Sequence, residues 1–281
     1  MAQSDSEMIQ ASFARPRYEI IPMKGVEQEL AHLPPDAVVT VTSSPTRGLD
    51  ATLALTALLL RRDQLQVVPH IAARLVADTV HLKDLLQQLS DLGIDEVFVV
   101  AGDAEAPAGK FEGTVDLLRA MADVGHALRI GITGYPESHA FIPDGTTIAL
   151  MHAKEPYASY IVSQICFDPG VTARWIAAVR ARGTRLPIHI GLPGAVDLPK
   201  LVRVSMRVGI GDSLRFVRKQ GGTVARLIGG YQPDALVDGL LPTLADPAMD
   251  VAGWHLFTFN EIRRTEAWRQ DLLRRYARSA T

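Results

Sequence analysis

Eight short apolar runs rich in β-branched residues divide the chain, and longer stretches with helical spacing separate them. A strand followed by a helix, repeated eight times, predicts a single-domain α/β fold, the (β/α)₈ TIM barrel. Several runs are apolar along most of their length, as at 97–100, which is typical of parallel strands covered on both faces. The runs are Tyr18–Pro22, Ala37–Ser43, Leu65–Ala72, Glu96–Gly102, Leu128–Gly134, Tyr160–Phe167, Leu186–Leu192 and Trp254–Asn260.

The stretches between these runs have apolar residues at helical spacing. An open doubly wound sheet is the alternative fold, but it would need a glycine-rich turn after an early strand, and the first run continues instead as Pro22-Met23-Lys24-Gly25. The expected helices are Leu53–Arg62, Leu82–Leu92, Val115–Val124, Ala173–Arg182 and Leu198–Val208, with a shorter helix-compatible connection from Lys24 to Leu33.

The two ends of the chain differ. Residues 1–16 are polar and show no periodicity, so we expect a flexible tail, with the catalytic barrel spanning 17–281. The stretch Glu261–Ser279 carries six arginines, and its apolar residues predict an amphipathic last helix with a solvated basic face.

Composition excludes several classes of protein. The 281 residues carry a formal net charge of −2, which argues against a nucleic-acid or polybasic membrane-surface protein. A single cysteine, Cys166, rules out an internal disulfide and a multi-cysteine metal site. No apolar run is long enough for a transmembrane helix, and the N-terminus lacks the pattern of a secretory signal, so we expect a cytoplasmic protein.

Polar residues gather at the C-terminal ends of the predicted strands, where barrel enzymes place their chemistry. Glu19 lies within the first apolar run, so it is either an outward-facing or ion-paired residue or a buried acid with a raised pKa. The other polar residues at these ends are Thr42, His70, Asp103, Tyr135, His139, Gln164 and Thr258.

Two hydrolase classes and a covalent cysteine enzyme fit this set poorly. The first strand lacks the His-x-His pair of metal-dependent barrels and the other histidines are scattered, so we expect no metal. No G-x-S-x-G elbow is present. Cys166 lies between two apolar residues, which indicates a core position. Two acids, a glutamine and several hydroxyls suit an enzyme that acts on a small polar heterocycle.

At these same positions the chain resembles the methylenetetrahydrofolate reductase family, from about Tyr18 to about Asn260. The motifs occur in the family's order, each at the end of a predicted strand. They are Tyr-Glu-Ile-Ile-Pro at 18–22, Val-Thr at 41–42, Pro-His at 69–70, Gly-Asp at 102–103, Tyr-Pro-Glu-x-His at 135–139, Ser-Gln followed by Ile-Cys-Phe-Asp at 163–168, and Phe-Thr-Phe-Asn at 257–260.

The resemblance implies hydride transfer from NAD(P)H, through FAD, to methylenetetrahydrofolate. It assigns Glu19 as the general acid that opens the five-membered ring, and Asp103 as a catalytic group near the pterin and the flavin. Gln164 and Thr258 would contact the substrate. Thr42, His70, Asp103, Tyr135, His139 and Lys154 would line the cofactor site. Tetrahydrofolate derivatives and a nicotinamide nucleotide are therefore the expected partners, and a homo-oligomer is compatible with the sequence.

Departures from the family pattern fall mainly on the cofactor side. The arginine that normally precedes Gly102-Asp103 and helps hold the flavin is Ala101 here, and alanine offers neither charge nor donors. Three alternatives stay open: direct hydride transfer from NADH without a flavin, a pterin-binding methyltransferase or lyase without redox chemistry, and a barrel that binds folate or flavin without catalysis.

Overall fold

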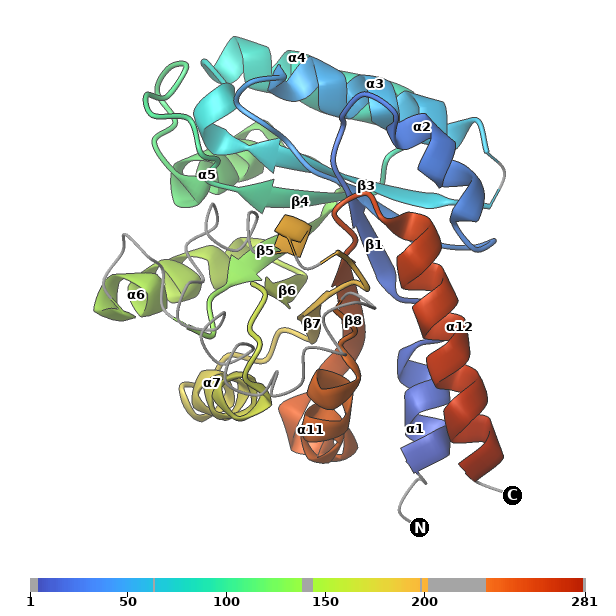
Figure 1. The fold of residues 1–281 in the computed structure, drawn as a ribbon. Helices are drawn as coiled ribbons and strands as arrows, with labels where there is room; N and C mark the ends of the chain where they lie inside the picture. Colours follow the sequence, from blue (N-terminus) through green and yellow to red (C-terminus); the bar gives the residue numbers. More distant parts are fainter. Residues whose placement is uncertain (1–4, 63, 138–143, 198, 202–230, 280–281) are drawn as a thin grey trace.

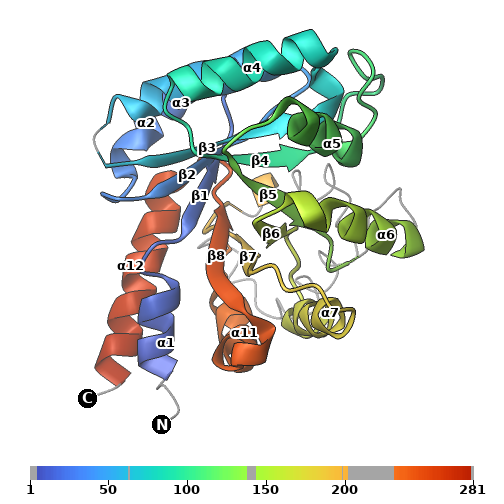
Figure 2. The same ribbon diagram turned by 180° about the vertical axis from the view of Figure 1, so that it is seen from behind.

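A closed barrel of eight parallel strands forms the centre of the molecule, and β8 pairs with β1 to close it. The computed structural model describes residues 5–62, 64–137, 144–197, 199–201 and 231–279. Figure 1 shows the strands surrounded by helices, and Figure 2 shows the same arrangement from behind. The strands are β1 (Arg17–Ile20), β2 (Val38–Val41), β3 (Gln66–Ala72), β4 (Glu96–Val100), β5 (Arg129–Gly134), β6 (Tyr160–Ser163), β7 (Ile188–Pro193) and β8 (Val251–Phe257).

The predicted (β/α)₈ barrel is confirmed, and the expected helices in the described part of the chain all form, with shifts of a few residues at their ends. The predicted helix at Leu198–Val208 falls almost entirely outside the described residues. The helices are α1 (Asp5–Ser12), α2 (Val26–Glu29), α3 (Gly48–Leu60), α4 (Thr79–Asp91), α5 (Thr114–Val124), α6 (Asp144–Lys154), α7 (Pro169–Ala181), α11 (Asp234–Ala245) and α12 (Ile262–Ser279), with short 3₁₀ turns at Leu30–His32, Ala73–Leu75, Glu155–Tyr157 and Pro247–Met249.

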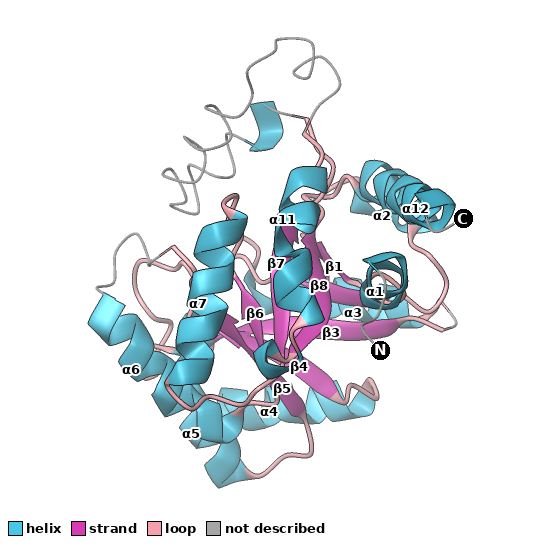
Figure 3. Ribbon diagram, turned by 90° about the horizontal axis from the view of Figure 1, so that it is seen from below, coloured by secondary structure: helices cyan, strands magenta, loops and turns pink. Residues whose placement is uncertain are grey.

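The expectation of a loose N-terminal tail is wrong for residues 5–16. They begin with α1, whose Ile9 is fully buried. Phe13 follows α1, stacks on Trp254 with ring centroids 5.1 Å apart, and meets Trp268 edge-on. Arg269 of α12 donates to the Phe13 carbonyl over 2.7 Å. Figure 3 shows α1 beside α12. The large apolar residues of the segment, Met8, Ile9 and Phe13, are too few to give it a visible period.

The strand alternation divides the core into two layers. Residues such as Tyr18 and Ile20 point outward and join the large cluster beneath the helices. Inward-pointing residues form a smaller cluster in the barrel, made of Val38, Val68, Phe98, Tyr160 and Val162. Because both faces of each strand are covered, the strands read as nearly continuous apolar runs.

A buried charge network lies at the start of the strands, below the inner cluster. Arg17 lies 2.5 Å from Glu96, donates to the Tyr160 hydroxyl over 3.2 Å, and lies over the Tyr160 ring. Glu96 also pairs with Arg129 at 3.2 Å and accepts from Gln66. This network pairs the charged residues that begin β1 and β4. The polar groups near the C-terminal ends of the strands therefore lie outside it.

Within the described residues, no helix has the length and apolar character needed to cross a membrane.

Candidate functional site

Glu19 points into the barrel, because alternation along β1 places it on the same face as Arg17. Its side chain is 15% exposed, and its Oε2 lies 3.1 Å from Nε2 of His255 on β8. Nε2 of His70, on β3, lies 3.9 Å from the same oxygen, too far for a hydrogen bond. The structure therefore brings one acid and two histidines from three strands together, and the outward-facing alternative for Glu19 is excluded.

The electrostatics of this cluster favour a proton on the acid. Burial raises the pKa of Glu19 to about 7, and nearby His70 partly opposes that rise. Burial lowers the pKa of His70 to about 4 and that of His255 to about 3. Near neutral pH both imidazoles are uncharged while Glu19 is close to half protonated. A carboxylic acid with a pKa near the working pH is suited to general acid catalysis.

Three buried polar atoms around Glu19 have no hydrogen-bond partner among the described residues. They are Oγ1 of Thr40, Nε2 of His70 and Nδ1 of His255. Thr40 faces the barrel interior directly beside Glu19, because the two residues are register partners on β1 and β2. Buried polar atoms in folded proteins are nearly always bonded, so such a group marks a place for a ligand or ordered water.

Thr258 is fully buried, and its hydroxyl donates to the carbonyl oxygen of Glu19 over 2.6 Å. The same hydroxyl accepts from the backbone N–H of Asn260 at 3.1 Å. The Asn260 amide in turn exchanges two hydrogen bonds with the backbone of Ile21. Thr258 thus holds Glu19 through its backbone, and direct contact between Thr258 and a substrate stays a prediction.

Thr42 and Gln164 stand just beyond the C-terminal ends of β2 and β6. The Thr42 N–H donates to Ile20 over 2.9 Å, and the Gln164 N–H donates to Gly134 over 2.8 Å, so each extends its strand pairing by one step. The Gln164 side-chain oxygen accepts from the following backbone N–H of Ile165. Both side chains are half-buried at the barrel mouth.

Asp103 and Tyr135 lie at the same end of the barrel. Asp103 is exposed in the loop after β4. Burial raises the pKa of Tyr135, a hydrogen bond with Thr133 opposes the rise, and the nearby Asp103 charge adds to it. His139 lies outside the described residues.

Lys154 ends α6 with its side chain buried. Its Nζ donates to the Thr133 carbonyl over 3.0 Å, and burial lowers its pKa to about 8. A flavin contact from Lys154 stays a prediction, since this ammonium is bonded to β5.

At the position before Gly102-Asp103, the described residues offer no free cation to help hold a flavin. Ala101 is exposed and carries no charge. The neighbouring cation, Arg74, donates to the carbonyls of Ala104, Glu105 and Glu112 at 2.7, 2.7 and 3.1 Å. Its guanidinium pins the loop after β4 and is committed to backbone, so it does not replace the missing arginine.

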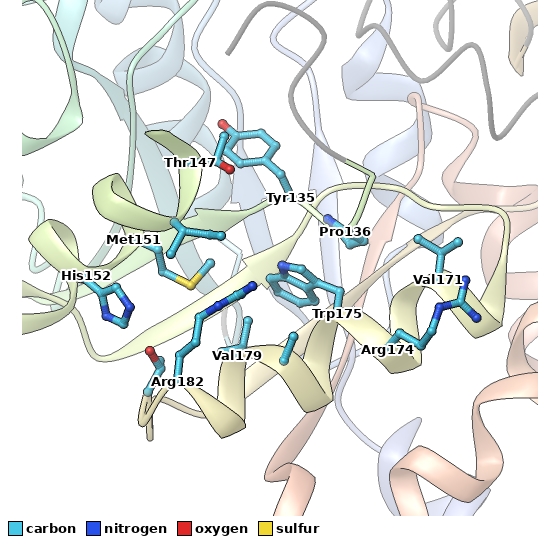
Figure 4. Close-up of a pocket in the computed structure, with 13 residues that line it drawn as sticks. Tyr135, Pro136, Thr147, Met151, His152, Val171, Arg174, Trp175, Val179 and Arg182 are labelled. Atoms are coloured by element: carbon cyan, nitrogen blue, oxygen red, sulfur yellow. The ribbon is translucent and has the colours of Figure 1, made fainter. Parts of the chain in front are cut away.

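A separate hollow of about 290 Å³ lies between α6 and α7. Figure 4 shows Arg182 extending beside Trp175 toward Met151, with Arg174 on the far side of the indole. Tyr135 contributes to this hollow, but Glu19, His70 and His255 do not. We therefore place the candidate chemistry at the barrel mouth and not between the helices.

His255 is the main site residue that the sequence reasoning missed. Period-two alternation in the last strand places it on the same face as Phe257, and both turn inward, 4.8 Å apart between ring centroids. Its contact with Glu19 depends on the closure of β8 on β1, which pairs Phe257 with Glu19. In the described part of the chain, no three His, Cys, Asp or Glu side chains form a group suited to a metal ion.

Comparisons with known proteins bear on the family and the fold of this chain. A stretch of 123 residues, 40% of this chain, is 26% identical to methylenetetrahydrofolate reductase 2 of Saccharomyces cerevisiae. That stretch spans only 20% of the yeast protein's length.

Among solved structures, the fold is similar to that of an uncharacterized protein from Clostridium thermocellum that binds two copies of 5-methyl-5,6,7,8-tetrahydrofolic acid. The TM-score is 0.64 at 13% identity, and the match covers 95% of this chain and 98% of that one. The model of the family described as methylenetetrahydrofolate reductase matches residues 23–210, about two thirds of the sequence. The chain belongs to the methylenetetrahydrofolate reductase family.

Proposed function

We propose that the protein reduces 5,10-methylenetetrahydrofolate to 5-methyltetrahydrofolate with NAD(P)H as the source of hydride. The observation that carries this proposal is Glu19, a mostly buried acid with a pKa of about 7 that is surrounded by unpartnered polar atoms in the barrel of a reductase-family chain. A protein that only bound folate would have no use for a protonated acid in this position, which costs folding free energy at neutral pH.

In the proposed reaction Glu19 gives its proton to the bridge nitrogen of the substrate. The five-membered ring opens, and the positive charge moves to the iminium formed with the other nitrogen. Hydride from the nicotinamide then adds to the methylene carbon and gives the methyl group, while the nucleotide leaves in its oxidised form. Glu19 recovers a proton from water. A positioned general acid contributes roughly a hundredfold to ten-thousandfold to such a step.

The polar residues of the mouth are proposed to hold the pterin. Gln164 offers an amide at the end of β6, and Asp103 offers a carboxylate after β4. Together they supply both acceptors and donors for a flat heterocycle. The neighbour from Clostridium thermocellum binds 5-methyl-5,6,7,8-tetrahydrofolic acid, which is in keeping with such a ligand.

The route of the hydride is the finer part of the proposal. FAD stays the prediction made from the resemblance. Direct transfer from the nicotinamide is favoured because the Arg74 guanidinium is already bonded to backbone carbonyls and Ala101 has no charge with which to hold a flavin.

The test follows NADH and NADPH oxidation by purified protein with and without methylenetetrahydrofolate, and identifies the product by mass. Oxidation that depends on folate and yields 5-methyltetrahydrofolate supports the proposal. Tight binding of 5-methyltetrahydrofolate with no oxidation of either nucleotide would favour the non-redox methyltransferase or lyase.

A further inference from the structure

The hydrogen bond between Glu19 and His255 joins two buried groups on neighbouring strands. We propose that His255 is a positioning residue that donates its Nε2–H to Oε2 of Glu19, which leaves Oε1 as the oxygen that carries the reacting proton. This inference rests on the proposed function only for the fate of that proton, because the pairing itself is read from the geometry.

The imidazole of His255 is held in one orientation. Its residue is 1% exposed, and its ring meets Phe257 at 4.8 Å between centroids with an interplanar angle of 60°. Phe98 lies on another side at 6.4 Å. With the ring fixed, Nε2 stays 3.1 Å from Glu19, whereas Nε2 of His70 lies 3.9 Å away and makes no hydrogen bond.

The Nε2–H of His255 has a chemical consequence once the Glu19 carboxyl group has lost its proton. A buried carboxylate is costly to form, and an N–H aimed at it lowers that cost. Removing the donor therefore raises the pKa of Glu19 and makes it a weaker acid. In this tautomer the neutral imidazole donates from Nε2 and keeps Nδ1 as an acceptor, and Nδ1 has no hydrogen-bond partner among the described residues.

Other charged and titratable groups face the same interior. Arg17 precedes Glu19 on β1 but is bonded to Glu96. His70 approaches from β3. His189, on β7, is also a histidine inside the barrel, but its ring meets Tyr160 edge-on at 5.4 Å. His189 is therefore the matched control for His255.

The experiment titrates Glu19 directly in protein without substrate. Carbon-13 NMR of side-chain-labelled glutamate follows each carboxyl group with pH, and Glu19→Gln identifies the signal. His255→Leu is expected to raise the pKa of Glu19 by about one unit or more, since a hydrogen bond to a charged group is worth at least that much. His255→Gln, which can place an amide N–H near the former Nε2, should restore most of the shift. His189→Leu should leave the Glu19 signal in place.

A Glu19 pKa that does not move in His255→Leu would overturn the proposal, as would an equal shift in His189→Leu. If His255→Leu does not fold, His255→Asn takes its place, because its amide reaches only the former Nδ1 position. Asn and Gln variants with the same Glu19 pKa would then overturn it.

Activity provides an independent readout. The alkaline limb of kcat should move upward by the same amount as the NMR pKa while the maximal rate falls. A Glu19 pKa that shifts as expected in a protein that never reduces methylenetetrahydrofolate would leave the pairing intact and remove the proposed function. Reduction of methylenetetrahydrofolate, together with a Glu19 pKa that does not move in His255→Leu, would support the proposed function and overturn the pairing.

Discussion

The Thr258 hydroxyl donates to the carbonyl oxygen of Glu19 over 2.6 Å, at the seam where β8 closes the barrel on β1. The acid of the candidate site is thus held from two sides by the last strand and the residue after it, through its backbone by Thr258 and through its carboxyl group by His255. The site exists only when the barrel is closed.

Thr258→Val removes this hydroxyl while it keeps the side chain's shape. The loss of a buried donor should lower the free energy of unfolding by about 1–2 kcal/mol and also reduce turnover, because Glu19 loses part of its support. Thr56→Val is the matched control, since Thr56 donates to the Thr52 carbonyl over 2.8 Å within α3, far from the site. Urea unfolding and kcat are measured for both. Equal kcat in the two variants would show that Thr258 has no role in positioning.

Glu19 should destabilise the folded protein at neutral and alkaline pH. Its pKa is raised from 4.5 to about 7 on folding, so the folded protein keeps the proton where the unfolded chain has lost it. Stability therefore falls as pH rises from about 4.5 to 7, by about 3 kcal/mol at roughly 1.4 kcal/mol per unit. The free energy of unfolding of Glu19→Gln relative to the native protein should rise by that amount between pH 4 and pH 8.

Urea unfolding across this pH range measures the difference. Glu27→Gln, on the exposed side of α2, controls for the loss of one carboxylate. A constant difference between Glu19→Gln and the native protein would contradict the raised pKa.

The buried network below the site should contribute strongly to stability. Glu96 is fully buried against Arg17, so Glu96→Gln leaves a buried guanidinium without its counter-charge. We expect a loss of about 3–5 kcal/mol, and substantial recovery in the double variant Arg17→Met with Glu96→Leu. Asp271→Asn, from an exposed pair with Arg274, should cost under about 1 kcal/mol. Comparable urea midpoints for Glu96→Gln and Asp271→Asn would refute a structural role for the network.

Flavin retention should be weak, because the Arg74 guanidinium donates to backbone carbonyls of the loop after β4 and the Ala101 side chain has no hydrogen-bond donor. After incubation with FAD and desalting, we expect no flavin absorption band. Ala101→Arg, at an exposed position, should increase retention if the missing guanidinium is the cause. A strong band in the unmodified protein would mean that other residues hold the cofactor.

The fold was predictable because its signal is local. Runs such as Val97–Val100 and the helical spacing between the strands directly reflect burial on both faces, and the structure places all eight strands within a few residues of their predicted positions. The observed strand ends differ from the predicted ones because the polar residues that flank a strand form ladder hydrogen bonds only where the neighbouring strand is present. The predicted sixth strand continued to Phe167, but β6 ends at Ser163, since Gln164 is the last of these residues to bond to β5.

The site was predictable only in part. Glu19, His70 and Gln164 stood out because they lie at strand ends and match family motifs. The partner of Glu19 did not, because the contact with His255 joins residues 236 positions apart and depends on barrel closure. The hydrogen bonds from Arg74 to backbone carbonyls likewise depend on the path of the loop after β4, for which the sequence carries no periodic signal. Non-local pairings of this kind follow from tertiary structure and not from spacing.

The most direct test of the account is the pH dependence of methylenetetrahydrofolate reduction by the native protein and by Glu19→Gln. The account predicts that kcat of the native protein falls about tenfold per pH unit above pH 7, because only protonated Glu19 reacts. It predicts that Glu19→Gln stays folded by circular dichroism and loses roughly a hundredfold or more in kcat. Turnover by Glu19→Gln at the native rate, with the same alkaline limb, would contradict the central role of this acid.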